Sequence, residues 1–447
     1  MTILGRVHAK IGDLWWYTAL LFVAQRLGDA VNMVLGLWLV PKYVPMQELG
    51  AVLPLLSIVG IVGLPFAVVT TPFTRFLAIY SKSGELGKAK SMLRDAFVAS
   101  AALLFVSFLI AVFALPFFFE RLWIGQGSLG ILVVAVALTG TLSTIVGSAV
   151  QGLGKFDAAV AIHAVSAPFR LVAFIVLLPF RPLSAYFMGQ AAQPGISIVG
   201  GLWACRRILG KSVRAMPYLR EDGRKILRYT LPVLLWTIAT TISGNIEMML
   251  VRHRLPAFDS AGFYVISRFS EIAAYLGSAF SFLLFPMAST CGAKDAKSLK
   301  LIRHAVFGCA ASGALVAGLL AVGGEWLLSL TPVWRPYVGF SDDMALLALN
   351  SAIGIAMTCL ISFEMAQNRF GFLRYLVPLL AVKAVLLLSL CGCTFFGDLV
   401  PDAMAGAVAE LNPNRLPFLV AAFLAFNVIG VVMLAIDIFT VRPAQKP

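Results

Sequence analysis

The chain has 447 residues, of which 60% are hydrophobic and only 13% are charged, and its mean hydropathy is +0.91. A single soluble core cannot hide this much apolar surface, so the composition excludes an ordinary soluble protein and requires a lipid bilayer. A net charge of +14 would favour nucleic acid as the partner of a soluble protein. Here the basic residues collect in alternating loops between apolar segments, so we expect no nucleic-acid binding.

Apolar segments long enough to cross a bilayer recur along the whole chain. A helix needs about 20 apolar residues to span the hydrocarbon core. Twelve such segments are expected to begin near Trp15, Leu49, Ala96, Leu129, Ala158, Ala185, Leu227, Ala261, Ala305, Met344, Tyr375 and Phe418. We therefore predict an all-α polytopic membrane protein with about twelve transmembrane helices.

Three positions in the first half recur in the second half at nearly constant spacing. The offsets are 212, 214 and 214 residues for the pairs Gly50 and Gly262, Pro72 and Pro286, and Phe156 and Phe370. Weak internal symmetry is typical of secondary transporters, whose two repeats enclose a substrate path near the bilayer midplane. We predict two six-helix repeats around a central cavity: an N-terminal lobe at 1–206, a basic cytoplasmic linker at 207–226 and a C-terminal lobe at 227–447.

The distribution of basic residues predicts the orientation. Of the 35 Lys and Arg residues, 24 lie in the termini and in alternate loops on one side, seven lie in the opposite loops, and the remaining four lie within predicted spans. Because cytoplasmic loops are enriched in Lys and Arg, both termini are expected in the cytoplasm. We expect a multi-pass protein of the cytoplasmic membrane.

Eight charged residues fall inside the predicted spans. A charge within the bilayer is costly, so each is a candidate functional residue. The basic residues are Arg26, Arg170, Arg268 and Lys383, and the acidic residues are Asp29, Glu247, Glu271 and Glu364. The basic residues are candidates for binding a substrate, and the acidic ones for coupling to an ion or for pairing with a cation.

Two pairs among these residues are spaced to lie on one helical face. Arg26 and Asp29 are three residues apart, as are Arg268 and Glu271, so each pair can form an ion pair that merely fixes packing. Lys383 has no opposite charge within one turn of its own span, and neither does Arg170. Each therefore requires a partner on another helix or on a substrate.

Polar neighbours allow a more specific prediction of the role of two of these residues, Arg170 and Glu247. Arg170 shares a helical face with His163, two turns earlier, which suits a wall that binds an anion; the alternative for His163 is a buried structural histidine. Glu247 follows Gly244 and Asn245, and this polar patch predicts either a cation or proton site or a hydrogen bond to another helix. Arginine would favour a phosphorylated headgroup, because its planar guanidinium donates two parallel hydrogen bonds to phosphate.

Motifs of a nucleotide motor or a metal enzyme are missing from the sequence. Gly154-Lys155-Phe156 lacks the upstream glycine and the following Ser or Thr of a phosphate-binding loop. The six cysteines and four histidines do not have metal-ligand spacing. We expect no catalytic residue, metal or cofactor, and a cycle driven by a gradient, by the membrane potential or by consumption of the product.

Five short segments have a recognisable sequence: Asn245–Arg252 (NIEMMLVR), Ala261–Arg268 (AGFYVISR), Leu284–Pro286 (LFP), Leu49–Gly50 and Gln151–Phe156 (QGLGKF). They resemble segments of bacterial polysaccharide transporters, which belong to the multidrug/oligosaccharidyl-lipid/polysaccharide exporter superfamily. The resemblance implies two six-helix lobes that open alternately and move undecaprenyl-pyrophosphate-linked sugars outward. It also implies that Arg26, Arg170, Arg268 and Lys383 face the substrate.

Three alternatives to an oligosaccharide flippase remain open. A cation- or proton-coupled multidrug antiporter of the same superfamily would use Asp29 and Glu247 as its cation sites. The segment Arg26–Asp29 (RLGD) is also similar to lipid II flippases. A membrane glycan polymerase or ligase is the alternative of another class. The short outer loops and the internal repeat of this chain argue against it. The expected partners are a lipid-linked glycan, membrane lipids and, as a further candidate, a glycan polymerase; we expect a monomer.

Overall fold

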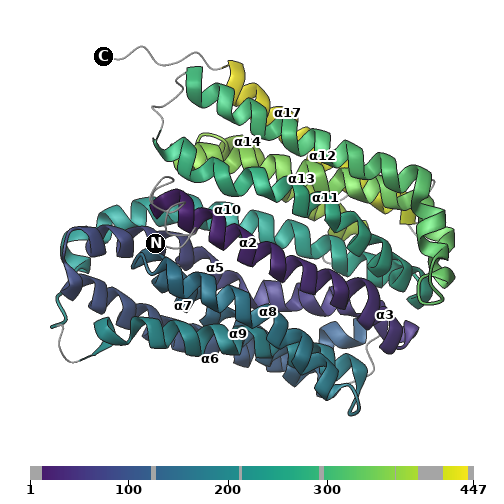
Figure 1. Ribbon diagram of the computed structural model, residues 1–447, viewed down its shortest axis with the longest axis horizontal. Helices are drawn as coiled ribbons and strands as arrows, with labels where there is room; N and C mark the ends of the chain where they lie inside the picture. Colours follow the sequence, from purple (N-terminus) through teal and green to yellow (C-terminus); the bar gives the residue numbers. More distant parts are fainter. Residues whose placement is uncertain are drawn as a thin grey trace, which may run out of the picture. The chain divides into compact units, whose positions relative to one another are not determined.

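The described residues of the computed structural model are 13–121, 127–210, 214–290, 296–367, 369–390 and 416–440, and within them all regular structure is helical (Figure 1). The long helices are α2 (Asp13–Met33), α5 (Val52–Lys82), α6 (Leu86–Arg121), α7 (Gly127–Gly152), α8 (Phe156–Leu177), α9 (Pro182–Leu209), α10 (Leu219–Arg254), α11 (Ala257–Thr290), α12 (Ala296–Ser329), α13 (Ser341–Ala366), α14 (Leu373–Leu390) and α17 (Leu416–Thr440). One long helix corresponds to each of the twelve predicted spans.

Four short helices complete the described structure. They are the π-helix η1 (Val34–Leu39), α3 (Val40–Tyr43) and α4 (Met46–Leu49), which follow α2, and the 3₁₀-helix η2 (Arg335–Phe340), which precedes α13. Pro45 and Pro41 lie at the starts of α4 and α3, where a missing backbone N–H costs no helical hydrogen bond.

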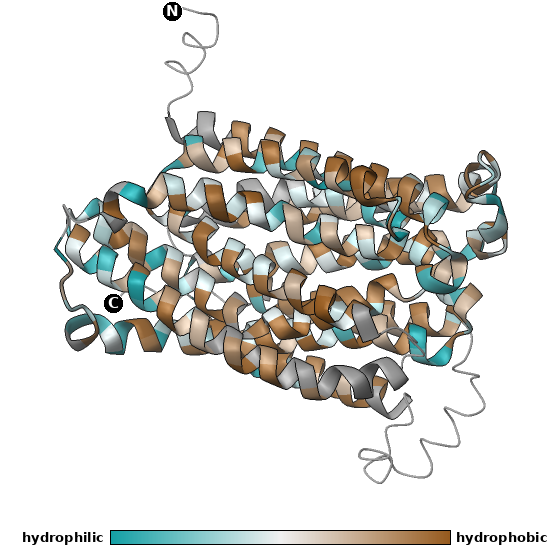
Figure 2. Ribbon diagram, turned by 90° about the horizontal axis from the view of Figure 1, so that it is seen from below, coloured by the Kyte–Doolittle hydropathy of each residue, from teal (hydrophilic) through white to brown (hydrophobic). Residues whose placement is uncertain are grey.

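The helices have the composition of membrane spans. Eight helical stretches of the described chain are long and apolar enough to cross a membrane. Figure 2 shows hydrophobic residues along the lengths of the helices and hydrophilic residues gathered near their ends. Within a bilayer, helices are favoured because they satisfy every backbone hydrogen bond internally.

Three helices begin earlier than hydropathy predicts. Helix α6 starts at Leu86 rather than near Ala96, α10 starts at Leu219 rather than near Leu227, and α12 starts at Ala296 rather than near Ala305. All three extensions are rich in charged residues, which a hydropathy criterion rejects although their backbone continues the helix. As a result, residues 219–226 of the predicted linker are helical, and its described extended part is short, at 214–218.

The chain divides into two compact units. The first contains residues 1–35 and 55–241, and the second contains residues 36–54 and 242–447. The unit boundaries fall within continuous helical segments, at 35/36 in η1, 54/55 in α5 and 241/242 in α10. The sequence-based division into contiguous lobes stays a prediction.

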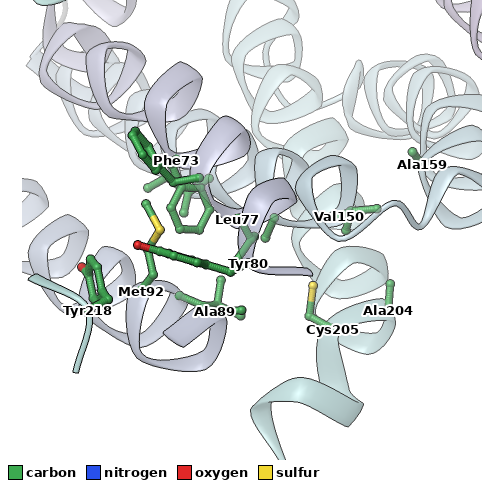
Figure 3. Packing of buried hydrophobic residues seen from close by; sticks show 14 of the residues in the cluster. Phe73, Leu77, Tyr80, Ala89, Met92, Val150, Ala159, Ala204, Cys205 and Tyr218 are labelled. Atoms are coloured by element: carbon green, nitrogen blue, oxygen red, sulfur yellow. The ribbon is translucent and has the colours of Figure 1, made fainter. Parts of the chain in front are cut away.

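In the first unit, α9 packs against both α7 and α8, and α8 also packs against α2. A buried cluster joins α5, α6, α7, α8 and α9 and includes Phe73, Leu77, Tyr80, Met92 and Val150 (Figure 3). Tyr218, which precedes α10, is buried in the same cluster, and its ring meets that of Tyr80 edge to face with 6.3 Å between centroids. This contact fixes the start of α10 to the first unit.

In the second unit, α13 is the central helix. It packs against α11, α12 and α17, while α14 packs against α17 and α4 packs against α11. Small residues permit the closest approaches: a Cβ on Gly313 of α12 would overlap the side chain of Ala352 on α13. Close packing through small residues is the usual basis of helix association in membranes.

Gly50, at the end of α4, provides a test of this packing. A Cβ there would lie 2.8 Å from Cβ of Ser260 and 3.0 Å from the backbone oxygen of Ala257. We expect Gly50→Ala to destabilise the protein by about 1–3 kcal/mol through overpacking, seen as a lower melting temperature of the purified protein. The control is Gly140→Ala on α7, where a Cβ has no neighbour within 4 Å. Equal melting temperatures for the two variants would contradict the packing described.

Candidate functional site

Arg170, in the middle of α8, lies at the centre of a polar network in the first unit. Its side chain is buried, with 8% of the residue exposed. The guanidinium donates hydrogen bonds to Oδ1 of Asn32 (2.7 Å), Oε1 of Gln193 (3.5 Å) and the hydroxyl of Tyr186 (3.5 Å). It also lies over the Tyr186 ring, 5.6 Å from the centroid. Arg170 is thus held in place by side chains from α2 and α9.

The local sequence explains how these side chains reach Arg170. Gly189 on α9 faces α8, and a Cβ there would lie 3.2 Å from the backbone oxygen of Arg170. The absence of a side chain lets the two helices approach closely. Tyr186 and Gln193 lie one turn to either side of Gly189 and can therefore contact the guanidinium. Gln190 donates to the Tyr186 hydroxyl at 2.8 Å and so orients it.

A cavity with a mixed polar and apolar wall lies beside this network. It consists of two adjoining hollows of about 350 and 290 Å³, which share Ser143, His163 and Ser197 in their walls. The wall combines amide and hydroxyl side chains from α5, α7, α8 and α9 with apolar ones; its other polar members are Thr70, Thr144, Ser148, Gln151, Ser166, Gln190 and Gln193. Gln193 links the cavity to Arg170, because its side chain lines the second hollow and accepts a hydrogen bond from the guanidinium.

His163 lines both hollows of this cavity, and its side chain is exposed. The sequence left two interpretations, a wall residue or a buried structural histidine, and the structure places His163 in the wall. Its role in binding stays a prediction.

Arg26 and Asp29 of α2 form the ion pair that their spacing predicts. Nη2 of Arg26 lies 3.1 Å from Oδ2 of Asp29, and their side chains are 25% and 19% exposed. The Arg26 guanidinium also lies 5.1 Å from the centroid of the Phe22 ring. The carboxylate proposed as a cation site of an antiporter is therefore already in contact with a cation.

In the second unit, Lys383 on α14 has the partner that the sequence required on another helix. Its ammonium pairs with Oε1 of Glu247 on α10, and the two residues are 2% and 6% exposed. Lys383 also donates to Oδ1 of Asn427 on α17 at 3.4 Å, and the Asn427 amide donates to Oδ1 of Asn350 on α13 at 2.8 Å. Four helices therefore meet at one buried ion pair.

Arg268 and Glu271 of α11 form the third pair. Nη1 of Arg268 lies 2.8 Å from Glu271, whose Oε2 also accepts a hydrogen bond from Tyr275 at 3.2 Å. The Arg268 side chain packs against Gly36 of η1, where a Cβ would lie 3.0 Å from Cδ of Arg268. The pair thus holds the π-helical segment against α11.

The structure therefore sorts most of the predicted residues into local groups. It brings together Arg26 with Asp29, Arg268 with Glu271, Lys383 with Glu247, and Arg170 with the cavity that His163 lines. Glu364 lies on α13, with 4% of the residue exposed. In the part of the chain that the structure describes, no three His, Cys, Asp or Glu side chains are grouped to hold a metal ion.

Sequence reasoning missed the neutral members of these groups. Asn32, Tyr186 and Gln193 surround Arg170, and Asn350 and Asn427 complete the network around Lys383. Amide side chains within apolar spans were a usable signal, because polar groups inside the membrane need partners. The sequence did not show which of these side chains belongs to which network, because this depends on which helices pack together.

Comparison with known proteins shows the fold. No family model matches the sequence, and no curated protein matches it. Three similar solved structures, each covering most of the chain, are an inward-facing multidrug resistance MATE family transporter of the MOP superfamily (13% identity, TM-score 0.61, 95% of this chain and 96% of that chain), a MATE protein in complex with MaD5 (12%, 0.62, 96% and 97%) and the lipid II flippase MurJ in an inward closed conformation (12%, 0.59, 94% and 87%).

These similarities extend over nearly the whole chain and confirm the predicted all-α polytopic membrane fold. At this level of identity they establish the architecture alone.

The Arg268 and Glu271 pair can be tested by exchanging its charges. Arg268→Glu and Glu271→Arg should each lower stability by about 1–3 kcal/mol, because each leaves like charges together and breaks a charge-assisted hydrogen bond. The double exchange should recover most of that loss, measured as the melting temperature of the purified protein. The same exchange at the exposed pair Arg94 and Asp95 serves as the control and should change little. A double exchange as unstable as the sum of the single variants would show that Arg268 does not act through Glu271.

Proposed function

We propose that this protein is a flippase that moves a lipid-linked oligosaccharide, carried on undecaprenyl pyrophosphate, across the cytoplasmic membrane by alternating access. The observation that carries the proposal is the buried Arg170 with its network, beside a cavity whose wall includes amide and hydroxyl side chains. Such a site offers a cation for a phosphate group and neutral polar groups for sugar hydroxyls. Arg26, Arg268 and Lys383 are the other basic residues proposed to act on the substrate, directly or through their partners.

The chemistry of the Arg170 site suits a phosphate in a low-dielectric setting. Arginine stays charged when buried, and its guanidinium can donate two parallel hydrogen bonds to phosphate oxygens. Asn32 and Gln193 fix the guanidinium plane, so little conformational entropy is lost when an anion binds. The side-chain oxygens and N–H groups around the cavity can both donate and accept, which is what neutral sugar hydroxyls require.

A cation-coupled multidrug antiporter of the same superfamily is less well supported. Its two candidate cation sites, Asp29 and Glu247, are each in an ion pair with a basic side chain, Arg26 and Lys383. A drug cation or a coupling ion would have to displace a cation that belongs to the chain. The similarity to MATE structures concerns the fold alone.

Transport of lipid II is the second candidate, favoured by the fold similarity to MurJ. It shares the lipid pyrophosphate and differs in the attached sugars and peptide, so Arg170 would have the same role. The transporters among the structural neighbours also favour transport over a glycan polymerase or ligase. We place both termini in the cytoplasm, and we propose a monomer with a glycan polymerase as a candidate partner.

The proposal predicts a specific transport defect. In proteoliposomes carrying a fluorescent undecaprenyl-pyrophosphate oligosaccharide, Arg170→Ala should slow flipping at least about tenfold, because a charge-assisted hydrogen bond contributes about 1.5–3 kcal/mol. Arg170→Lys should restore part of the rate by keeping the charge without the planar fork. Arg181→Ala, in the turn before α9, is the matched control and should flip at the native rate.

Two outcomes would contradict the proposal. If Arg170→Ala lowers the amount of folded protein and the flipping rate per folded molecule stays native, Arg170 is structural. If the native protein does not flip the lipid but moves cationic dyes against a sodium or proton gradient, the antiporter alternative is correct.

A further inference from the structure

We propose that Lys383 is a built-in cation: its ammonium occupies the position at which a monovalent metal ion would otherwise neutralise Glu247. The second unit then carries its positive charge covalently and does not take up sodium at this position. This inference rests on the buried pair and not on the identity of the transported lipid, although its meaning for coupling depends on the protein being a transporter.

The geometry of the pair supports this inference. Glu247 and Lys383 come from helices that are far apart in the sequence, and both are almost completely buried. Asn427 accepts a hydrogen bond from the ammonium, and Asn350 in turn accepts one from Asn427. The ammonium therefore contacts a carboxylate oxygen and an amide oxygen, and a second amide oxygen is one hydrogen bond further along the network.

The surrounding atoms are those that a hard metal cation prefers. Carboxylate and side-chain amide oxygens are ligands of hard cations, and Glu247, Asn427 and Asn350 supply them from three helices. An ammonium offers one positive charge and three N–H donors, and that of Lys383 contacts the oxygens of Glu247 and Asn427. Lys383 thus engages with its own side chain two of the three oxygens that would form an ion site, and the third, on Asn350, accepts from Asn427.

The cost of burying a charge explains why Glu247 requires a cation beside it. An ionised carboxylate in a low-dielectric interior is strongly unfavourable unless it is paired. Removal of one partner from a buried pair leaves the other charge uncompensated and is much more harmful than removal of both. Without Lys383, the folded protein must therefore recruit another cation to Glu247 or lose stability.

A consequence for transport follows directly. A carboxylate that gains and loses a metal ion during the cycle couples transport to the gradient of that ion. A carboxylate paired with a lysine of the same chain binds no ion from either side. On this basis, the second unit does not use a sodium gradient at Glu247.

The test measures sodium binding without requiring a substrate. The native protein and Lys383→Met are purified in detergent, and melting temperatures are compared in sodium chloride and in choline chloride at equal ionic strength; retention of ²²Na⁺ is measured in parallel. The native protein should melt at the same temperature in both salts and retain no ²²Na⁺. Lys383→Met should melt at least about 2 °C higher in sodium and retain one ion per chain.

Two further variants keep the test decisive. Lys383→Arg keeps the charge and should show no sodium response. The double variant Lys383→Met with Glu247→Gln removes both charges and should fold without responding to sodium. If Lys383→Met folds only in sodium, that rescue is itself the expected result.

Three results would overturn the inference. The first is stoichiometric ²²Na⁺ retention by the native protein. The second is a folded Lys383→Met variant that is indifferent to sodium. The third is failure of Lys383→Met to fold in either salt while the double variant folds.

Discussion

The low dielectric of the bilayer is the constraint on which the rest of this structure depends. A charge in that setting must have a partner, and the chain meets the requirement with side chains from its own helices. Arg26 with Asp29 and Arg268 with Glu271 do so within one helix, and Lys383 with Glu247 does so between helices. Arg170 differs in being set among amides and a phenol beside a cavity, which makes it the strongest candidate for contact with an anion.

The fold was largely predictable from the sequence, and the site was predictable only in part. The lengths of the apolar segments predicted the twelve long helices, because a helix that crosses a bilayer requires about 20 apolar residues. The two pairs spaced by three residues were also predictable, since helical periodicity places them on one face. The Lys383 and Glu247 pair was not, because their contact depends on the packing of α14 against α17 and on the position of α10, which hydropathy does not encode.

The polar network around Arg170 was likewise only partly predictable from the sequence. His163 was visible as a neighbour of Arg170 in the sequence, whereas Asn32 is 138 residues away along the chain. A glycine on the facing helix, Gly189, allows these groups to meet. Helix starts were likewise placed too late at α6, α10 and α12, where charged residues continue the helix beyond the apolar segment.

The boundaries between the two units fall inside helices rather than in loops. The first lies in a π-helix and the second at Pro54 near the start of α5, while Gly244 follows the third, within α10. A π-helix departs from regular α-helical hydrogen bonding at one point, whereas Pro54, in the first turn of α5, removes no helical hydrogen bond. Because the chain is helical across all three boundaries, relative motion of the units would bend these helices. Bending would store elastic energy, and the chain itself would supply part of the restoring force.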